Sequence, residues 1–267
     1  MWKFFVCVLK WIDCRLNDLL GGGFGLKDVF TIFNLLGGVT SIYFSIHGNI
    51  KLAAAAVMIG YLGDVLDGPI ARVTGRGNPF GGELDSIADH LSQCIAPAFV
   101  VYVFFRDIST PLGFALASIL IVTGSVRHAR NAAVPFGFSL CWNGMPRPVA
   151  AFLVLSFINS HFITWFTGGV WVGVGLVLVV SIMNLVPLPF LNHHGRKLQL
   201  YVKVLVVGSF ALCIALAVLF PPLFWDALFL IIFGYSWFSW VPMSREERKS
   251  FFDAVRAWKK ELNKENQ

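Results

Sequence analysis

Residues 63–90 of the chain read GDVLDGPIARVTGRGNPFGGELDSIADH. Asp64 and Asp67 are three residues apart and therefore share one face of a helix. Asp85 and Asp89 are four residues apart at the start of the next helix and also share a face. Because the glycine-rich connection between the two helices reverses the chain, we expect the four carboxylates to meet at one depth.

Four carboxylates cannot all stay ionised in a site of low dielectric constant unless positive charge neutralises them. Each charge placed inside a bilayer costs about 2.5–3.5 kcal/mol on insertion scales, and like charges add repulsion. Arg72 supplies one positive charge, and two divalent cations would cancel the four negative ones. A set of oxygen ligands without His or Cys favours Mg²⁺, Mn²⁺ or Ca²⁺. The segment therefore predicts a site for two divalent cations.

The rest of the chain is strongly apolar. Of its 267 residues, 57% are hydrophobic and 13% are charged, with a mean hydropathy of +0.71. Soluble domains carry about 25% charged residues, so a soluble globule and a disordered chain are both excluded. The composition and the long apolar runs predict an all-α polytopic membrane protein. Eight transmembrane helices are expected, near residues 29–47, 52–73, 84–105, 112–130, 149–166, 168–188, 199–220 and 223–241.

Both ends of the chain differ from this apolar centre. Residues 4–20 have the pattern of an amphipathic helix that lies in the membrane interface. At the other end, Ser244 and Glu247 have the spacing of a capping box, and a charged amphipathic helix is expected to follow. The sequence thus divides into an interfacial segment, a transmembrane core that carries the carboxylates, two C-terminal transmembrane helices and a charged tail, at residues 1–28, 29–188, 189–242 and 243–267.

The distribution of Lys and Arg predicts the orientation. The connections after the even-numbered spans and both termini are basic, which places the termini and the carboxylates on the cytoplasmic side of the cell membrane. The net charge of +6 then indicates cytoplasmic loops and anionic headgroups rather than nucleic acid. The five cysteines are scattered without a C-x2-C pair, so neither a disulfide framework nor a thiolate metal site is expected.

The carboxylate segment resembles the signature of the CDP-alcohol phosphatidyltransferases, D-x2-D-G-x2-A-R, then a spacer, then G-x3-D-x3-D. All eight fixed positions match, at Asp64, Asp67, Gly68, Ala71, Arg72, Gly81, Asp85 and Asp89. The resemblance extends over residues 29–150. It implies a core of six transmembrane helices, to which this chain adds two, and a homodimer.

The resemblance also implies roles for these residues. Asp64, Asp67 and Asp85 would bind Mg²⁺ or Mn²⁺. Asp89 would lie at the edge of the metal site, as a further ligand and as the general base that takes the proton of the acceptor hydroxyl. The CMP portion of the donor would contact Gly68, Ala71, Arg72 and Gly81. The implied reaction is attack of an alcohol on the lipid-side phosphorus of a CDP-linked lipid, with release of CMP.

Two further segments resemble the phosphatidylserine synthase branch of this family. One is R-x2-R-N at residues 127–131, and the other spans Asn143 to Ala151, where Met145 and Val149 depart from the branch's Leu and Ala. Residues 28–41 resemble that branch's first helix. The branch implies CDP-diacylglycerol as donor and L-serine as acceptor.

A zwitterionic serine needs a cation for its carboxylate and an acceptor for its ammonium group. Arg127 and Arg130 would hold the carboxylate, and Asn131 or a backbone carbonyl would accept from the ammonium group. The same arginines suit a phosphate or serve as ordinary cytoplasmic charges. Glycerol 3-phosphate, an inositol phosphate or choline therefore remain alternative acceptors. A divalent-cation transporter that uses the same aspartates is the alternative from another class.

Overall fold

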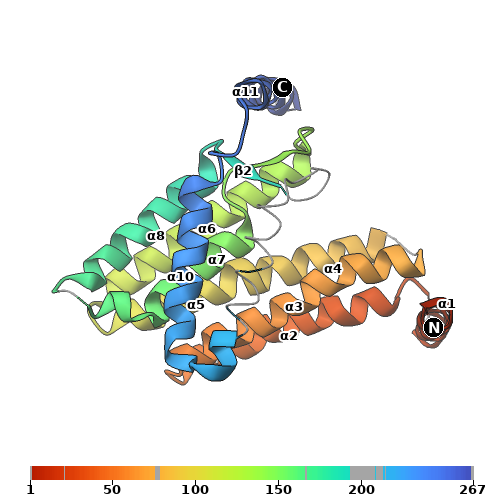
Figure 1. Ribbon diagram of the computed structural model, residues 1–267, viewed down its shortest axis with the longest axis horizontal. Coiled ribbons are helices and arrows are strands. Elements are labelled where there is room, and N and C mark those ends of the chain that lie inside the picture. The colour runs from red at the N-terminus through yellow and green to blue at the C-terminus, as the bar shows by residue number, and fades with distance from the viewer. Residues whose placement is uncertain are drawn as a thin grey trace. The chain divides into compact units, whose positions relative to one another are not determined.

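A computed structural model describes residues 2–20, 22–75, 79–165, 167–192, 208, 213 and 215–265. Most of these residues are helical (Figure 1). The chain forms two compact units, residues 1–107 and 108–267. No disulfide joins the five cysteines, all of which lie in the described part of the chain.

The first unit is built around one central helix, α2, which packs against α3, α4, the π-helical turn η1 and α5. The described elements of this unit are α1 (Trp2–Leu19), α2 (Leu26–Ile46), α3 (Ile50–Thr74), α4 (Pro79–His90), η1 (Leu91–Ile95) and α5 (Ala96–Arg106). The predicted N-terminal helix is confirmed as α1. Its Asp13 accepts a hydrogen bond of 2.7 Å from the backbone N–H of Leu26 and so ties α1 to the start of α2.

Helix α2 has the reverse of the pattern found in soluble proteins. Its buried side chains are small or polar, and they recur at the three- and four-residue spacing of one helix face: Thr31, Asn34, Gly38, Ser41 and Ser45. Its large apolar side chains point outward, with Phe33 46% and Leu36 54% exposed. Polar groups that face the bundle and apolar groups that face outward fit a lipid surrounding.

Glycines bring α2 and α3 into backbone contact. A Cβ atom at Gly37 would lie 2.6 Å from the Cα of Gly60 and 2.9 Å from the carbonyl oxygen of Ala56. On another side of α2, a Cβ at Gly38 would lie 2.9 Å from the Cα of Ser92 in η1. Close approach at small residues is typical of membrane helices, where van der Waals packing replaces the hydrophobic effect between helices.

The helix that carries Asp85 and Asp89 contains one widened turn. Residues 79–106 form one continuous helical stretch in which η1 separates α4 from α5. Pro97, near the start of α5, has no N–H to donate, and its ring crowds the carbonyl of Gln93 in the preceding turn. The backbone N–H of Ala96 bonds to the carbonyl of Leu91, five residues back. Widened turns of this type are frequent at functional sites.

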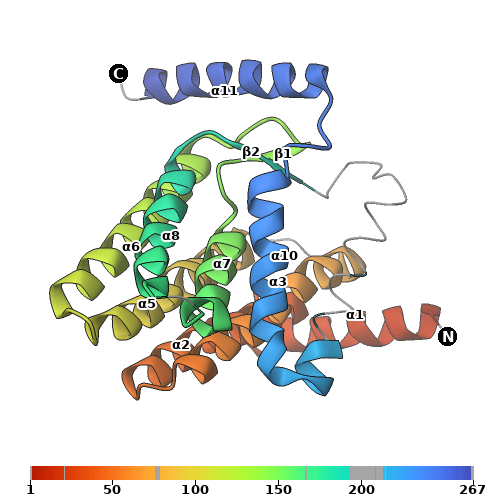
Figure 2. The same ribbon diagram turned by 60° about the vertical axis from the view of Figure 1, so that its left-hand side comes forward.

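The second unit contains five α-helices, one short 3₁₀ helix and two short strands among its described residues. They are α6 (Thr110–Ala133), β1 (Cys141–Asn143), α7 (Arg147–Asn159), η2 (His161–Ile163), α8 (Gly169–Leu185), β2 (Pro189–Leu191), α10 (Pro221–Phe238) and α11 (Arg245–Glu265). Helix α6 packs against α8, and α7 against α8 and α10 (Figures 1 and 2).

Strands β1 and β2 form a small antiparallel ladder that the sequence analysis did not predict. Cys141 pairs with Leu191, and Asn143 pairs with Pro189. Gly144, with φ +75°, turns the chain away directly after β1. Three residues in each strand are too few for a recognisable alternation of apolar and polar side chains. The predicted helical class is otherwise confirmed.

The C-terminal helix α11 follows the predicted capping box. The Ser244 backbone N–H donates to Glu247 Oε2 (2.9 Å), and the Glu247 N–H donates to Ser244 Oγ (3.1 Å). One face of α11 is buried within the second unit. Phe251 and Val255 pack with Cys141 and with residues of the connection that precedes it. The Trp258 indole N–H donates to the carbonyl of Val134 (2.7 Å).

The membrane class predicted from composition is confirmed, but the number of eight spans is not. Four described helical stretches are long and apolar enough to cross a bilayer: Leu26–Ile46, Pro79–Arg106, Thr110–Ala133 and Pro221–Phe238. The predicted span at 52–73 forms α3. The predicted spans at 149–166 and 168–188 form the shorter apolar helices α7 and α8. Most of the predicted span at 199–220 lies outside the described residues.

Helix α7 is shorter than predicted because the chain changes direction at its end. Ser160 adopts an extended backbone, and the N–H of His161 donates to Asp226 Oδ1 (2.7 Å) instead of continuing the helix. The imidazole Nδ1 of His161 lies 2.6 Å from the other carboxylate oxygen of Asp226. This polar pair links η2 to α10.

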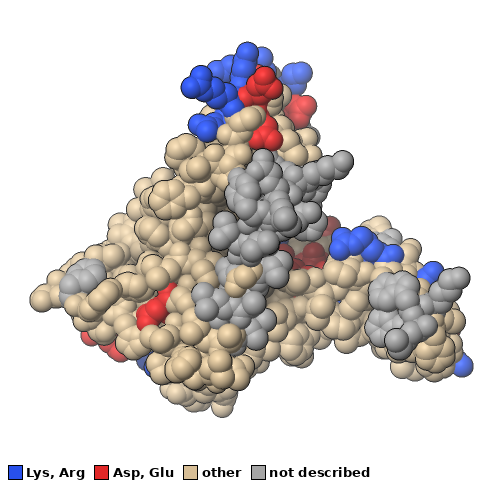
Figure 3. Space-filling model, viewed as in Figure 1, with Lys and Arg blue, Asp and Glu red and all other residues tan. Residues whose placement is uncertain are grey.

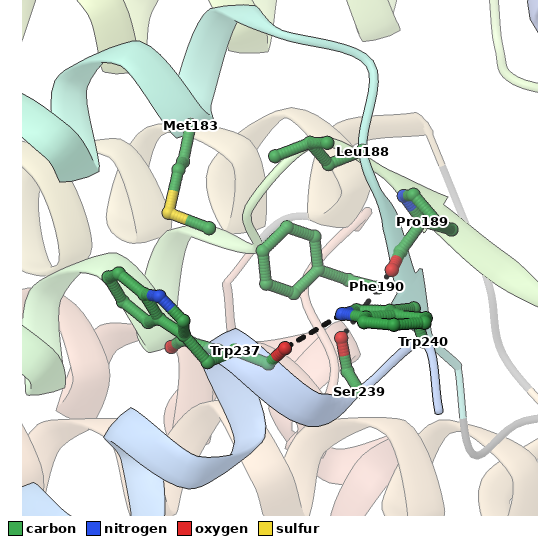
Figure 4. Close-up of a pocket in the computed structure, with 8 residues that line it drawn as sticks. Met183, Leu188, Pro189, Phe190, Trp237, Ser239 and Trp240 are labelled. Carbon is green, nitrogen blue, oxygen red and sulfur yellow. Dashed lines mark hydrogen bonds between the residues drawn. The ribbon is translucent and has the colours of Figure 1, made fainter. Parts of the chain in front are cut away.

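A small apolar pocket of about 190 Å³ lies where the end of α8, β2 and the end of α10 meet (Figure 4). The two hydroxyls in its lining bond to backbone carbonyls, Ser236 to Ile232 (2.7 Å) and Ser239 to Pro189 (3.4 Å). The other lining residues include Met183 and contribute apolar or aromatic side chains. This pocket therefore offers no charged group for phosphate chemistry.

The contact between α2 and α3 leads to a stability prediction. We expect Gly37→Ala to destabilise the protein by about 1–3 kcal/mol, since the new methyl group must push the two backbones apart. Gly175→Ala in α8 is the matched control because its Cβ meets nothing within 4 Å. Thermal unfolding in detergent should show a lower transition temperature for Gly37→Ala alone. Equal transition temperatures for both variants would contradict the packing described here.

Candidate active site

Three of the four predicted aspartates form one cluster. Carboxylate oxygens of Asp64 and Asp67, from α3, and of Asp85, from α4, lie within 4.8 Å of one another. All three side chains are half-buried. The left-handed backbone of Gly75 (φ +74°) ends α3 and lets the chain reverse toward α4. The expectation that a turn brings two acidic helix faces together is confirmed for these three residues.

Helix α2 contributes one polar side chain to this cluster and one to the neighbouring Asp89. The Thr31 hydroxyl donates to Asp67 Oδ2 (3.2 Å), and Asn34 Nδ2 donates to Asp89 Oδ1 (3.0 Å). Gly63 makes this approach feasible, because a Cβ there would meet the carbonyl oxygen of Phe30 at 2.5 Å. The close contact between the backbones of α2 and α3 thus brings the Thr31 hydroxyl and the Asn34 amide within hydrogen-bond distance of these carboxylates.

Asp89 is buried, with 8% of its surface exposed, and lies outside the three-carboxylate group. Gln93, in the widened turn η1, donates from Nε2 to Asp89 Oδ1 (2.7 Å) and to Asp64 Oδ2 (3.3 Å). Two amide groups, from Asn34 and Gln93, therefore fix one oxygen of Asp89. The assignment of Asp89 as a further metal ligand stays a prediction.

The residues of the cluster fit a hard divalent cation. Asp85 Oδ1 is buried and has no hydrogen-bond partner among the described residues. A buried carboxylate oxygen without a donor is costly unless a cation takes that place. The cluster contains only carboxylate oxygens, the ligands that Mg²⁺ and Mn²⁺ prefer. Asp64, Asp67 and Asp85 are the residues that would hold such ions.

The predicted donor-binding residues lie around the same turn. Gly68 and Ala71 are half-buried on α3, and Arg72 is exposed beside them. Gly81 is buried at the start of α4, where a Cβ would collide with Lys27 Nζ and Asp28 Oδ1. Those two side chains form an ion pair of 3.4 Å. Packing against α2 thus requires a glycine at position 81, whatever contact it makes with a nucleotide.

The predicted acceptor-binding residues belong to the second unit. Arg127, Arg130 and Asn131 lie in the last turns of α6. Arg127 is 8% exposed, and its Nε has no hydrogen-bond partner among the described residues. Arg147, at the start of α7, is close enough to repel it electrostatically. Arg130 is exposed and donates to the carbonyl of Leu185 (3.4 Å).

The positive charge of Arg127 has no ion-pair partner among the described residues. A buried guanidinium is normally paired with a carboxylate, because removing a charge from water is costly. Here a second arginine, Arg147, lies close enough to add repulsion instead of neutralising the charge. The end of α6 is therefore suited to an anionic group such as a carboxylate or a phosphate.

A half-buried cluster of carboxylate oxygens in a membrane protein is suited to bind divalent cations, and comparison with known proteins gives the family. The sequence profile described as CDP-alcohol phosphatidyltransferase matches residues 25–182. The chain belongs to this family, as its eight signature residues indicate, and is a membrane transferase of phospholipid biosynthesis.

Several curated proteins are similar over most of their length. The CDP-diacylglycerol–serine O-phosphatidyltransferase of Helicobacter pylori is 27% identical over 191 residues, which cover 68% of this chain and 79% of that protein. The enzyme of the same name from Mycobacterium tuberculosis is 27% identical and covers 79% and 75%. An archaetidylserine synthase of Methanothermobacter thermautotrophicus is 31% identical and covers 59% and 68%.

Among solved structures, one similar chain is a Mycobacterium tuberculosis phosphatidylinositol phosphate synthase crystallised with CDP-DAG bound. It is 26% identical, with a TM-score of 0.47, over 65% of this chain and 88% of that chain.

The sequence analysis missed three site residues, Thr31, Asn34 and Gln93. A signal for the first two was present, because polar or small residues recur on one face of an otherwise apolar helix. Gln93 had a weaker signal, as an amide four residues after Asp89 and four before Pro97. Neither amide belongs to the signature on which the analysis relied.

The cluster leads to a metal-binding prediction. We expect Asp67→Asn and Asp85→Asn each to weaken Mn²⁺ binding at least about tenfold, since losing even a residue that only hydrogen-bonds to a metal ligand costs that much. The control Glu83→Gln removes an exposed acid from α4, the helix that carries Asp85. This variant should bind Mn²⁺ like the unmodified chain. Electron paramagnetic resonance of free Mn²⁺, titrated with the full chain in detergent, measures this. Unchanged affinity in both Asp variants would contradict the ligand set.

Proposed function

We propose that this chain transfers a phosphatidyl group from CDP-diacylglycerol to L-serine, releasing CMP and forming phosphatidylserine. The carboxylate cluster of Asp64, Asp67 and Asp85 carries the proposal, since it is suited to neutralise a diphosphate. Serine as acceptor is supported by the names of similar proteins from bacteria and an archaeon. All of these names specify serine as the acceptor, although the lipid that they name differs.

In this proposal two divalent cations, Mg²⁺ or Mn²⁺, bind to Asp64, Asp67 and Asp85. When bound, such ions neutralise the diphosphate and stabilise the charge that develops as CMP departs. Thr31 holds Asp67 by its hydrogen bond, and Gln93 holds Asp64. These bonds fix the carboxylates before substrate arrives, which lowers the cost of assembling the site.

Asp89 is proposed as the general base. The serine hydroxyl oxygen forms a bond to the lipid-side phosphorus, the bond from that phosphorus to the CMP oxygen breaks, and the hydroxyl proton passes to Asp89. Asn34 and Gln93 both donate to Asp89 Oδ1, which orients the carboxylate by two bonds to one oxygen. Proton transfer needs a base held within hydrogen-bond reach of the acceptor, so this orientation supports the role.

The CMP portion of the donor is proposed to contact Gly68, Ala71, Arg72 and Gly81. The small residues on α3 leave room beside the carboxylates, and the exposed guanidinium of Arg72 suits a phosphate oxygen pair. The Lys27 ammonium group lies against Gly81 and adds positive charge at this end of α2.

For the acceptor, we propose that Arg127 binds the serine carboxylate, with Arg130 and Asn131 nearby on α6. The guanidinium is buried and its Nε has no hydrogen-bond partner in the described part of the chain, which supports this role, and Arg147 supplies a second positive charge. Asn131 is proposed to accept from the ammonium group. Arg130 is exposed and is expected to contribute less.

We also propose that the protein is a homodimer in the cytoplasmic membrane, with its termini and active site toward the cytoplasm. The distribution of Lys and Arg over termini and connections supports the orientation. The resemblance to the family supports the dimer.

One assay tests the proposed reaction. Purified protein is given CDP-diacylglycerol, Mg²⁺ or Mn²⁺, and serine, glycerol 3-phosphate, inositol phosphate or choline in separate reactions, and CMP release is followed. We expect CMP release with serine and little with the other alcohols. Release with glycerol 3-phosphate and not with serine would overturn the acceptor. No release with any alcohol would overturn the enzymatic proposal.

Asp89→Asn tests the general base. We expect turnover to fall by about 10²–10⁴-fold, because an amide cannot take the hydroxyl proton. Metal-dependent binding of CDP-diacylglycerol, measured by equilibrium binding, should change little. Loss of donor binding in this variant would instead assign Asp89 to the metal ligands.

Arg127→Gln tests the acceptor site. We expect the KM for serine to rise about tenfold or more, as charge-assisted hydrogen bonds to a carboxylate are lost. The KM for CDP-diacylglycerol should stay the same. Arg130→Gln removes the same charge from an exposed position of α6 and should have a smaller effect. An equal rise in both KM values for Arg127→Gln would contradict a role specific to serine.

A further inference from the structure

The C-terminal helix α11 has three distinct faces, and one of them is fixed in place. Phe251, Val255 and Trp258 form the buried face, which packs on residues that precede and include β1. The hydrogen bond from Trp258 to Val134 closes this contact. The rotation of α11 about its own axis is therefore set, and so is the direction of its other two faces.

One exposed face of α11 is a continuous basic stripe around an aromatic side chain. Its members recur at the alternating four- and three-residue spacing of a single helix face, at Arg245, Lys249, Phe252, Arg256 and Lys259. Phe252 is 48% exposed in the middle of the stripe. We call these five residues the basic stripe.

The acidic residues of α11 lie mainly on the other exposed flank. Glu246, Asp253 and Glu261 are separated by seven and eight residues and therefore share a face. Arg256 and Asp253 make one contact of 3.4 Å across the boundary, and both side chains are largely exposed. An exposed pair of this type is weak, so it leaves the stripe available for another anion. Figure 3 shows Lys and Arg side chains gathered over α11 with acidic side chains beside them.

Helix α11 begins next to the end of a candidate membrane span. Only residues 239–244 separate it from α10, and Figures 1 and 2 show α11 lying crosswise to α10. The end of α10 carries Trp237, and Trp240 follows it with 46% of its surface exposed. Tryptophans at the end of a span are typical of the membrane–water interface. This placement suits a helix that runs along the bilayer surface.

We propose that the basic stripe of α11 binds the anionic headgroups of the bilayer that holds the enzyme, with Phe252 inserted among the lipids. Basic side chains interleaved with an exposed aromatic one are the pattern of helices that lie on anionic membranes. The buried face stays on the second unit, so lipid binding fastens the connection between α6 and β1 to the membrane surface.

Hydrogen exchange of the full chain in nanodiscs tests this proposal. One set of nanodiscs contains phosphatidylcholine alone, and in the other about a third of the lipid is phosphatidylglycerol, which makes the surface anionic. We expect several-fold slower amide exchange over residues 245–264 in the anionic nanodiscs. The difference should shrink at high salt, because salt screens exposed charges.

Two variants with equal numbers of altered charges separate the faces. The variant with Lys249→Gln, Arg256→Gln and Lys259→Gln should lose the difference between the two kinds of nanodisc. The control with Glu246→Gln, Asp253→Gln and Glu261→Gln should keep it. Equal exchange in both nanodiscs for the unmodified chain would overturn the proposal and leave an acidic protein surface as the partner of the stripe. A difference that survives in the basic-stripe variant would overturn it as well.

Discussion

Charge neutralisation inside a lipid-facing helix bundle is the constraint on which the rest of this structure depends. Asp64, Asp67 and Asp85 bring carboxylate oxygens within 4.8 Å of one another, which is tolerable only where cations and hydrogen-bond donors offset the repulsion. Helix α2 supplies part of that compensation through Thr31, which donates to Asp67, and it holds the neighbouring Asp89 through Asn34. Glycine contacts with α3 and η1 allow it to come close enough to do so.

Much of this site could be predicted because aspartates at spacings of three and four residues occupy one helix face whatever surrounds them. The turn at Gly75 then brings the two faces together. Thr31, Asn34 and Gln93 could not be predicted in the same way. Their roles depend on how near the backbones approach and on a widened turn before Pro97, and both are properties of packing rather than of spacing. The ladder of β1 with β2 was missed for a similar reason, since its three-residue strands depend on partners far along the chain.

The two arginines of α6 differ in a manner that the sequence did not reveal. Arg127 and Arg130 are three residues apart near the end of one helix. Arg127 is nevertheless buried without an ion-pair partner among the described residues, whereas Arg130 is exposed. Burial therefore favours Arg127 over Arg130 as a site for an anion, and burial cannot be inferred from the spacing of the two residues. The tail shows the same principle, because the contacts of Trp258 decide which side of α11 remains available.

The most direct test of the account is anomalous diffraction from crystals of the protein grown with Mn²⁺. The account predicts anomalous peaks in contact with the carboxylate oxygens of Asp64, Asp67 and Asp85, with the Asp89 carboxylate still held by Asn34 and Gln93. Ordered, well-defined carboxylates at these positions without any Mn²⁺ peak between them would contradict it.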